Sequence, residues 1–392
     1  MTVYEDALKL HEENRGKLAV TSKVPLEDAG DLSLAYTPGV AQPCIEIHKN
    51  TENAYRYTSR WNTVAVVTDG TAVLGLGDIG PEAALPVMEG KALLMKKFGG
   101  LDAWPICLNT KDPDEIVSIV KAISPGFGAV NLEDISAPRC VEIERRLIEE
   151  CGIPVFHDDQ HGTAIVVTAA MINCLKLIHR DPEELRVVIS GAGAAGSSIV
   201  RMLYSLGFRK IYVFDSKGLV SRKNLKNPSA LKAELFEYTN PDDQDYRNLG
   251  EALAGADVFI GVSAPNLVSE EMIASMSEKN IVFPMANPEP EITYEKCISA
   301  GAYIVGTGRS DYPNQVNNLL AFPGIFRGAL DCRATRISEK MKMAAARAIA
   351  SLIKEEDLRR DYVIVSPFDP RVVSAVANAV GEMAKEEGYI RP

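Results

Sequence analysis

Short apolar runs alternate with amphipathic stretches along most of the chain. Residues 63–69 (TVAVVTD) and 103–108 (AWPICL) predict buried strands, because each is a nearly continuous apolar run of strand length. Residues 81–99 predict a helix that begins on a proline, where proline is tolerated, although Pro86 and Gly90 lower its helix propensity. The first part of the chain is therefore expected to alternate strands with helices.

From about residue 163 the alternation becomes regular. Helices are predicted over 163–178 and 197–206, and near the end of the chain over 337–353 and 371–388. Strands are predicted over 186–190, 210–215, 257–263, 281–287 and 303–308. This order is typical of a doubly wound parallel sheet.

We therefore predict an α/β protein of two domains. A chain of 392 residues exceeds the roughly 250 to 300 residues at which one hydrophobic core stops growing. The boundary is predicted near residue 160, with an N-terminal α/β domain over 1–160. A Rossmann-type dinucleotide-binding domain with C-terminal helices is predicted over 161–392.

Composition and charge exclude several classes of function. The 46% hydrophobic and 24% charged content is that of a globular protein, and a net charge of −11 disfavours binding to nucleic acid or anionic membranes. No uninterrupted apolar stretch approaches the roughly 20 residues of a membrane span, and the first residues do not resemble a secretory signal. Seven cysteines without a CxxC pair favour a reducing cytoplasm.

A glycine fingerprint at 191–196 (GAGAAG) predicts dinucleotide binding. It follows a predicted strand, opens a predicted helix, and precedes a second strand that ends in Asp215. The expected contacts are Gly191 for the tight turn, Gly193 for close approach of the pyrophosphate, Ala194, Ala195, Gly196 for helix packing, and Asp215 for a ribose hydroxyl. The acid favours NAD, whereas Lys217, Arg222 and Lys223 nearby leave NADP open.

A second match at 75–80 (GLGDIG) is a weaker dinucleotide candidate. Asp78 would repel phosphate, and no acidic residue ends the following strand. We interpret this match as a tight strand-to-helix turn near the substrate.

The segment 155–164 (VFHDDQHGTA) raises the question of a metal site. Zinc would use His157 and His161, but the glutamate of an HExxH motif is missing and Gly162 with Thr163 resembles a helix start. A helix start alone would also explain the paired aspartates.

Carboxylates elsewhere favour a different metal. Glu133 and Asp134 end an apolar strand, and a third carboxylate from Asp158 or Asp159 would complete an all-oxygen site suited to Mg²⁺ or Mn²⁺. Tyr36, just before a Pro-Gly turn, and Lys91, on the predicted helix, are further candidates, although each also has an ordinary structural explanation.

Together these motifs resemble the malic enzyme family, in the order and rough spacing of its short prokaryotic form. The resemblance runs from about residue 15 to about residue 385. Its motifs are AYTPGVA (35–41), VVTDGTAVLGLGDIG (66–80), EGKALL (89–94), NLEDI (131–135), FHDDQHGTA (156–164), GAGAAG (191–196), MANPEPE (285–291) and NNLLAFPG (317–324).

The resemblance implies oxidative decarboxylation of L-malate to pyruvate and CO₂ with NAD or NADP and Mg²⁺ or Mn²⁺, by a homodimer or homotetramer. It assigns Tyr36 as the acid that protonates enolpyruvate and Lys91 as the base. Burial of Lys91 beside a cation is expected to lower its pKa, as a base requires. Metal binding falls to Glu133, Asp134 and Asp159, with Asp158 in support. Asn287, which also faces the cofactor, and Asn318 would bind malate, with Asn317 in support.

One position departs from the family pattern. Larger members carry a substrate-binding arginine before the GLGD segment, where this chain has Thr71 and Ala72. Two other functions stay open on the residues alone. One is a metal-independent two-domain dehydrogenase, such as an amino-acid dehydrogenase, and the other is a nucleotide-sensing or scaffold protein that has lost catalysis.

Overall fold

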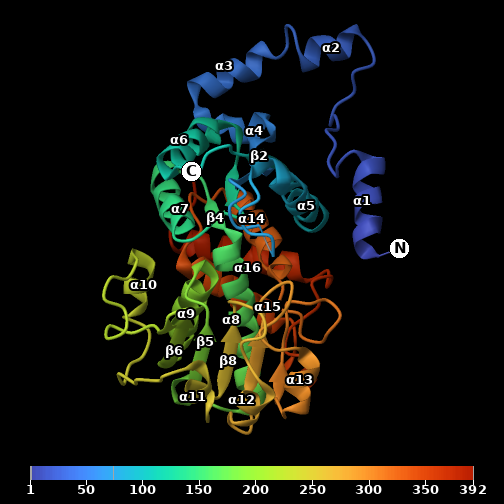
Figure 1. Ribbon diagram of the computed structural model, residues 1–392. Coiled ribbons are helices and arrows are strands. Elements are labelled where there is room, and N and C mark those ends of the chain that lie inside the picture. The colour runs from blue at the N-terminus through green and yellow to red at the C-terminus, as the bar shows by residue number, and fades with distance from the viewer. Residues whose placement is uncertain (1, 74, 392) are drawn as a thin grey trace.

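The computed structural model describes residues 2–73 and 75–391. These residues form two β-sheets that are joined by one long helix (Figure 1). The first sheet has the strand order β2-β1-β3-β4, and its strands are parallel throughout. Its strands are β1 (Thr63–Thr68), β2 (Asp102–Cys107), β3 (Ala129–Leu132) and β4 (Val155–His157). The strands predicted over 63–69 and 103–108 are confirmed within one residue at each end.

The second sheet has the order β10-β9-β8-β5-β6-β7, and β7 alone among its described strands is antiparallel to its neighbour. Its strands are β5 (Arg186–Ser190), β6 (Lys210–Asp215), β7 (Gly218–Leu219), β8 (Val258–Gly261), β9 (Ile281–Pro284) and β10 (Ile304–Val305). The order reverses direction beside β5, as in a doubly wound sheet. The predicted α/β fold class is confirmed, although β8, β9 and β10 are shorter than predicted.

Helices cover both sheets and the junction between them. Around the first sheet lie α4 (Ala54–Tyr57), α5 (Pro81–Gly99), α6 (Pro113–Ile123) and α7 (Arg139–Glu150). Around the second lie α9 (Ala194–Leu206), α10 (Ala230–Leu235), α11 (Leu249–Leu253), α12 (Glu270–Ala274) and α13 (Tyr294–Ser299). The C-terminal helices are α14 (Phe322–Asp331), α15 (Glu339–Ser351) and α16 (Val372–Glu386).

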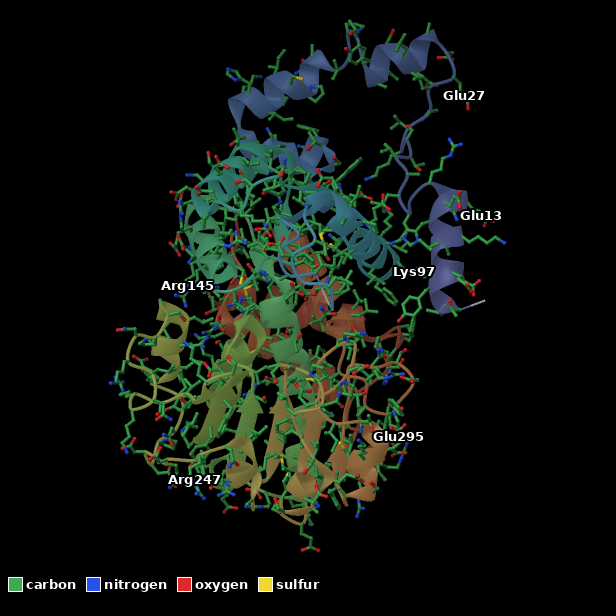
Figure 2. All side chains as sticks on the ribbon, in the orientation of Figure 1. Glu13, Glu27, Lys97, Arg145, Arg247 and Glu295 are labelled. Carbon is green, nitrogen blue, oxygen red and sulfur yellow. The ribbon has the colours of Figure 1, made fainter. Side chains whose placement is uncertain are left out.

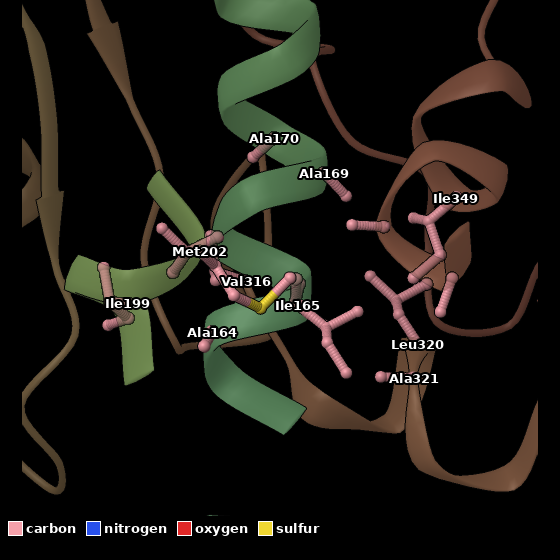
Figure 3. Packing of buried hydrophobic residues seen from close by; sticks show 14 of the residues in the cluster. Ala164, Ile165, Ala169, Ala170, Ile199, Met202, Val316, Leu320, Ala321 and Ile349 are labelled. Carbon is pink, nitrogen blue, oxygen red and sulfur yellow. The ribbon is translucent and has the colours of Figure 1, made fainter. Parts of the chain in front are cut away.

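The central helix α8 (Asp158–Ile178) runs from the end of β4 in the first sheet towards the second sheet (Figure 1). Its small apolar residues pack against α9 and α15, and Figure 3 shows Ala164, Ile165 and Ala169 among their neighbours. By length and composition α8 could cross a membrane, but 72% of that apolar window is buried inside the protein. It is the core helix of the molecule.

The start of α8 corrects a prediction. The helix begins at Asp158, five residues before Thr163, so both aspartates and His161 lie in its first turns. The predicted boundary at residue 160 falls inside this continuous helix, and the division into 1–160 and 161–392 stays a prediction.

Residues 2–49 form an extended N-terminal arm. It carries α1 (Val3–Asn14), α2 (Ala29–Ala35) and α3 (Ala41–Lys49), none of which buries a residue. Figure 1 shows α2 and α3 standing away from the sheets, and Figure 2 shows Glu13 and Glu27 of the arm apart from the body. The arm touches α5 at Lys17, whose backbone N–H donates to Glu89 at 3.0 Å.

Candidate active site and metal centre

Three carboxylates converge where the first sheet meets α8. Glu133 and Asp134 follow β3, Asp159 lies in the first turn of α8, and one oxygen from each lies within 4.8 Å of the others. Glu133 and Asp134 are buried, while the Asp159 side chain is 40% exposed. The cluster is therefore built from adjacent parallel strands and opens on one side.

The backbone conformation at Asp134 orients the carboxylates of this cluster. Asp134 has a φ of +53°, a left-handed conformation that aspartate tolerates better than most residues. Its N–H donates to Asp159 Oδ2 at 2.9 Å, and its carbonyl accepts from the N–H of Ala72 at 2.9 Å. The turn after β3 is thereby tied to both α8 and the β1–α5 loop.

The charges of the three carboxylates favour binding of a cation. Burial, with the charges of Asp159 and Glu133 added, raises the pKa of Asp134 to about 8. Burial likewise raises the pKa of Glu133. Asp134 Oδ2 is buried without a hydrogen-bond partner. An all-oxygen donor set with an unpaired oxygen fits Mg²⁺ or Mn²⁺, which prefer carboxylate ligands.

Lys91 of α5 lies beside these carboxylates. Its Nζ is 2.6 Å from Asp158 Oδ2, 2.9 Å from Glu133 Oε1 and 4.2 Å from the centroid of the Phe322 ring. Burial alone would lower the pKa of Lys91, but Asp158 and Glu133 outweigh it and raise that pKa. In the protein without metal, the negative charges surrounding Lys91 stabilise its ammonium form, and a lowered pKa beside a bound cation stays a prediction.

Asp158 is directed at Lys91, which lies between it and Glu133 of the cluster. Its Oδ2 also accepts a short hydrogen bond from the Asn318 side-chain amide. A Cβ on Gly162 would lie 2.1 Å from Asp158 Oδ1, so only glycine leaves space for this rotamer. Asp158 therefore joins the helix start, the lysine and one predicted substrate-binding asparagine.

The two histidines lie behind the carboxylates. Both are buried, and burial lowers the pKa of each. His157 Nδ1 is 4.0 Å from Asp159 Oδ2, whereas His161 Nε2 pairs with Glu144 Oε2 at 2.9 Å. The described residues bring no histidine or cysteine into the metal-like cluster, so the arrangement disfavours the zinc hypothesis.

The glycine fingerprint forms the predicted turn between β5 and α9. Gly191 has a φ of +121°, and a Cβ on it would lie 2.6 Å from the carbonyl oxygen of Val262. A Cβ on Gly196 would lie 1.9 Å from the Gly191 carbonyl oxygen, whereas one on Gly193 would meet no atom within 4 Å. Ala194 and Ala195 form the first turn of α9, whose free N–H groups suit a pyrophosphate.

A cavity of about 340 Å³ adjoins this turn. Its lining includes Gly193, Asp215 and Lys232. The Asp215 carboxylate accepts the N–H of Lys217 at 2.7 Å and makes a short ion pair with Lys232. Lys232 was missed in the sequence, and it partly cancels the charge by which Asp215 would reject NADP.

The GLGDIG turn lies in the loop between β1 and α5, as predicted. A Cβ on Gly75 would lie 3.0 Å from Cδ of Pro288, so this loop approaches the segment that carries Asn287. Asn287 is exposed there. Asn317 accepts the N–H of Leu319 at 2.9 Å and so caps a short helical turn next to Asn318.

Thr71, which lies where larger family members carry an arginine, makes hydrogen bonds that hold neighbouring loops together. Thr71 Oγ1 donates to Asp69 at 2.6 Å and accepts from the N–H of Ser136 at 2.9 Å. The guanidinium of Arg139 donates to Thr71 and also pairs with Asp69 at 3.0 Å. Thr71 and Arg139 thus hold the loops around the cluster together.

Tyr36 is the one predicted catalytic residue that the chain does not bring to the cluster. It ends α2 on the N-terminal arm and is 66% exposed. Within residues 2–73 and 75–391, no hydrogen bond involves its hydroxyl group.

Two residues near Lys91 were missed by the sequence analysis. Asn131, inside β3, donates to Glu133 Oε2 at 2.7 Å, and Phe322 lies under the ammonium. The buried amide in an otherwise apolar strand was the available signal for Asn131, whereas nothing in the local pattern distinguishes Phe322 from a core residue.

Comparisons with known proteins match both halves of the chain. Residues 15–148 match the malic enzyme N-terminal domain, and residues 160–385 match the malic enzyme NAD binding domain. The chain is 56% identical over 391 residues to the bifunctional malic/malolactic enzyme of Bacillus subtilis, covering 100% of this chain and 95% of that protein. It is 54% identical to the NAD-dependent malic enzyme of Geobacillus stearothermophilus, covering 96% and 78%.

A solved structure shares the fold. The NAD-dependent malic enzyme of Thermotoga maritima superposes with a TM-score of 0.93 at 49% identity, covering 96% of this chain and 99% of that one.

Proposed function

The chain belongs to the malic enzyme family, and on this premise we propose that it oxidatively decarboxylates L-malate to pyruvate and CO₂ with reduction of NAD(P). The observation that carries the proposal is the juxtaposition of Lys91 with the cluster of Glu133, Asp134 and Asp159. A base beside a divalent-cation site suits metal-assisted oxidation and decarboxylation of a 2-hydroxy acid.

Glu133, Asp134 and Asp159 would hold the Mg²⁺ or Mn²⁺ ion. When bound, such an ion supplies Lewis-acid stabilisation of the oxygen that becomes negatively charged. Glu133 would then be engaged by the cation, which would leave Lys91 with one of its two carboxylate partners. Burial would then shift Lys91 towards the neutral amine that a base requires.

In the proposed sequence, Lys91 takes the proton from the C2 hydroxyl while hydride leaves C2 for the nicotinamide. Oxaloacetate then loses its C4 carboxyl group as CO₂, which leaves the enolate form of pyruvate. Tyr36 donates a proton to C3, and Lys91 returns the proton to Tyr36. Because the second half of this sequence begins at oxaloacetate, the enzyme is also proposed to decarboxylate added oxaloacetate.

Tyr36 reaches a site in this scheme through a second copy of the chain. The arm that carries it buries no residue of its helices and exposes large apolar side chains that water disfavours: Val3, Tyr4, Leu8, Leu10, Leu18, Val20, Val24, Leu26, Leu32, Leu34, Val40 and Ile45. The α5 helix, which carries Lys91, in turn exposes Leu85, Val87 and Leu93. We therefore propose a homodimer in which each arm covers the partner and delivers Tyr36 to the partner's Lys91.

Both nicotinamide cofactors are proposed as substrates. Asp215 favours the unphosphorylated ribose of NAD, whereas its ion pair with Lys232 lowers the repulsion of a 2′-phosphate. A cytoplasmic location is also proposed, since the seven cysteines are all free thiols.

The assay that tests the reaction follows the absorbance of reduced nicotinamide with malate, each cofactor and Mn²⁺. The expected result is reduction that stops on chelation and returns with added Mn²⁺. Full activity in the presence of chelator would identify a metal-independent dehydrogenase instead. The absence of reduction with either cofactor would remove the enzymatic proposal.

A further inference from the structure

One buried glutamate holds both ends of the turn that carries Asp158 and Asp159. Glu144 of α7 accepts the backbone N–H of His157 on Oε1 at 2.8 Å. Its Oε2 accepts from Nε2 of His161 at 2.9 Å. Glu144 and His161 are each only 3% exposed.

The start of α8 depends on this contact. The first N–H groups of a helix need acceptors, and no side chain caps the N-terminus of α8. Asp158 is directed at Lys91, and Asp159 accepts the N–H of Asp134. Glu144 therefore supplies from another helix the acceptor that the two aspartates do not provide.

The charge of Glu144 is retained inside the protein. Burial by itself would raise the pKa of Glu144, but His161 and Lys342 hold it at about 2. The Lys342 ammonium lies 3.2 Å from both ring nitrogens of His161 and 2.7 Å from Glu339 Oε1. A buried charge with partners on each side fixes geometry more tightly than a single hydrogen bond.

His161 also connects this turn to the dinucleotide layer. Its Nδ1 lies 3.3 Å from the hydroxyl of Ser198, which is in α9 two residues after Gly196. The contacts of His161 thus join α7, α8, α9 and α15. This placement explains why two histidines flank the aspartates although neither belongs to the carboxylate cluster.

We propose that Glu144 and His161 are positioning residues that fix the first turn of α8 and thereby aim Asp159 at the divalent cation. The inference rests on the proposed function only for the presence of that cation. Neither residue touches the substrate or the reacting atoms in this account. Their effect passes through Asp159, and it is expressed in metal affinity before catalysis.

The experiment measures Mn²⁺ affinity of the metal-free, full-length protein by electron paramagnetic resonance of free Mn²⁺. Glu144→Gln and His161→Gln are each expected to weaken binding by about 10-fold to 100-fold, the usual effect of removing a group that orients a metal ligand. Hydrogen exchange at the His157 amide should also quicken in Glu144→Ala.

Asn173→Ala provides the matched control. Asn173 is buried in the same helix and donates to the carbonyls of Ala350 and Val363, each at 3.0 Å. This variant should lose stability, yet its Mn²⁺ affinity should stay within about twofold of the parent because its contacts are remote from the turn.

Wild-type Mn²⁺ affinity in folded Glu144→Gln and His161→Gln would overturn the positioning role. An equal loss of affinity in Asn173→Ala would overturn it as well, because general destabilisation would then be the cause. A wild-type protein that binds Mn²⁺ but does not oxidise malate would contradict the proposed function and leave this test intact.

Discussion

The Nζ atom of Lys91 lies 2.6 Å from Oδ2 of Asp158, and both side chains are buried. Asp159, the next residue, is directed instead at Asp134 and Glu133. Two consecutive carboxylates at one helix start therefore serve different partners. This division assigns Asp158 to the lysine and Asp159 to the carboxylates of the metal-like cluster.

Asparagine substitutions at these two positions should give different losses. Asp158→Asn weakens the contact that orients Lys91, so kcat should fall by about 100-fold or more while Mn²⁺ affinity changes by less than about threefold. Asp159→Asn removes a metal ligand, so Mn²⁺ affinity should fall by at least about tenfold. Steady-state kinetics and Mn²⁺ titration measure the two effects, and identical profiles for the two variants would contradict the division.

Two glycine substitutions should separate cofactor binding from folding. In Gly193→Ala the new Cβ meets no atom of the free protein, so the Tm should stay nearly unchanged while NAD affinity falls, because the methyl group lies where the pyrophosphate approaches. In Gly196→Ala the Cβ would lie 1.9 Å from the Gly191 carbonyl oxygen, so the Tm itself should fall. Thermal unfolding and NAD titration check both, and normal NAD affinity in Gly193→Ala would place the pyrophosphate elsewhere.

Heterodimers should reveal which subunit supplies Tyr36. A Tyr36→Phe chain paired with a Lys91→Ala chain, purified through two different tags, should regain about half the wild-type activity, because one site then combines an intact Lys91 with the partner's Tyr36. If each Tyr36 served its own subunit, both sites would lack one group and the heterodimer would be inactive.

A reversed pairing provides the control for that experiment. A wild-type chain paired with a Tyr36→Phe/Lys91→Ala chain should be inactive if the tyrosine acts across the dimer. Half of the wild-type activity in this heterodimer would contradict the exchange of arms.

The stability of the metal-free protein should depend on pH through Asp134. Its pKa is raised to about 8, so between about pH 4 and pH 8 the folded state holds a proton that the unfolded state releases. Folding stability contributed by this group therefore falls as pH rises through that window. The Tm difference between Asp134→Asn and the parent should grow from pH 5 to pH 8 without metal and shrink with Mn²⁺, and a pH-independent difference would contradict the raised pKa.

Much of this site was visible in the sequence because parallel strands bring their carboxyl ends together. Glu133 and Asp134 end a predicted strand, and the glycine fingerprint precedes a predicted strand ending in Asp215. These local patterns sufficed for the fold class and for Glu133 and Asp134, but they left Asp158 and Asp159 as alternatives, between which the family resemblance chose Asp159.

The start of α8 was misplaced for a physical reason. Gly162 resembles a residue at a helix N-terminus, but its lack of a side chain serves the close approach of Asp158 Oδ1 within the helix. The aspartates do not cap the helix in the usual way, because Lys91 and the Asp134 amide engage them.

Contacts between residues that are distant in the sequence could not be predicted from local sequence patterns. Lys342 approaches His161 across 181 positions, and Lys232 reaches Asp215 from a separate helix. The N-terminal arm could not be predicted from the sequence either. Its apolar side chains resemble ordinary core residues, and only the structure shows that they are exposed.

The central claim is that oxidation and decarboxylation of malate occur at one metal-dependent site. The direct measurement uses L-malate labelled with carbon-13 at the C4 carboxyl group and follows labelled CO₂ together with reduced nicotinamide. The account predicts equal amounts of the two products with Mn²⁺, and neither product from Asp159→Asn. Nicotinamide reduction without labelled CO₂, or unchanged release from Asp159→Asn, would contradict it.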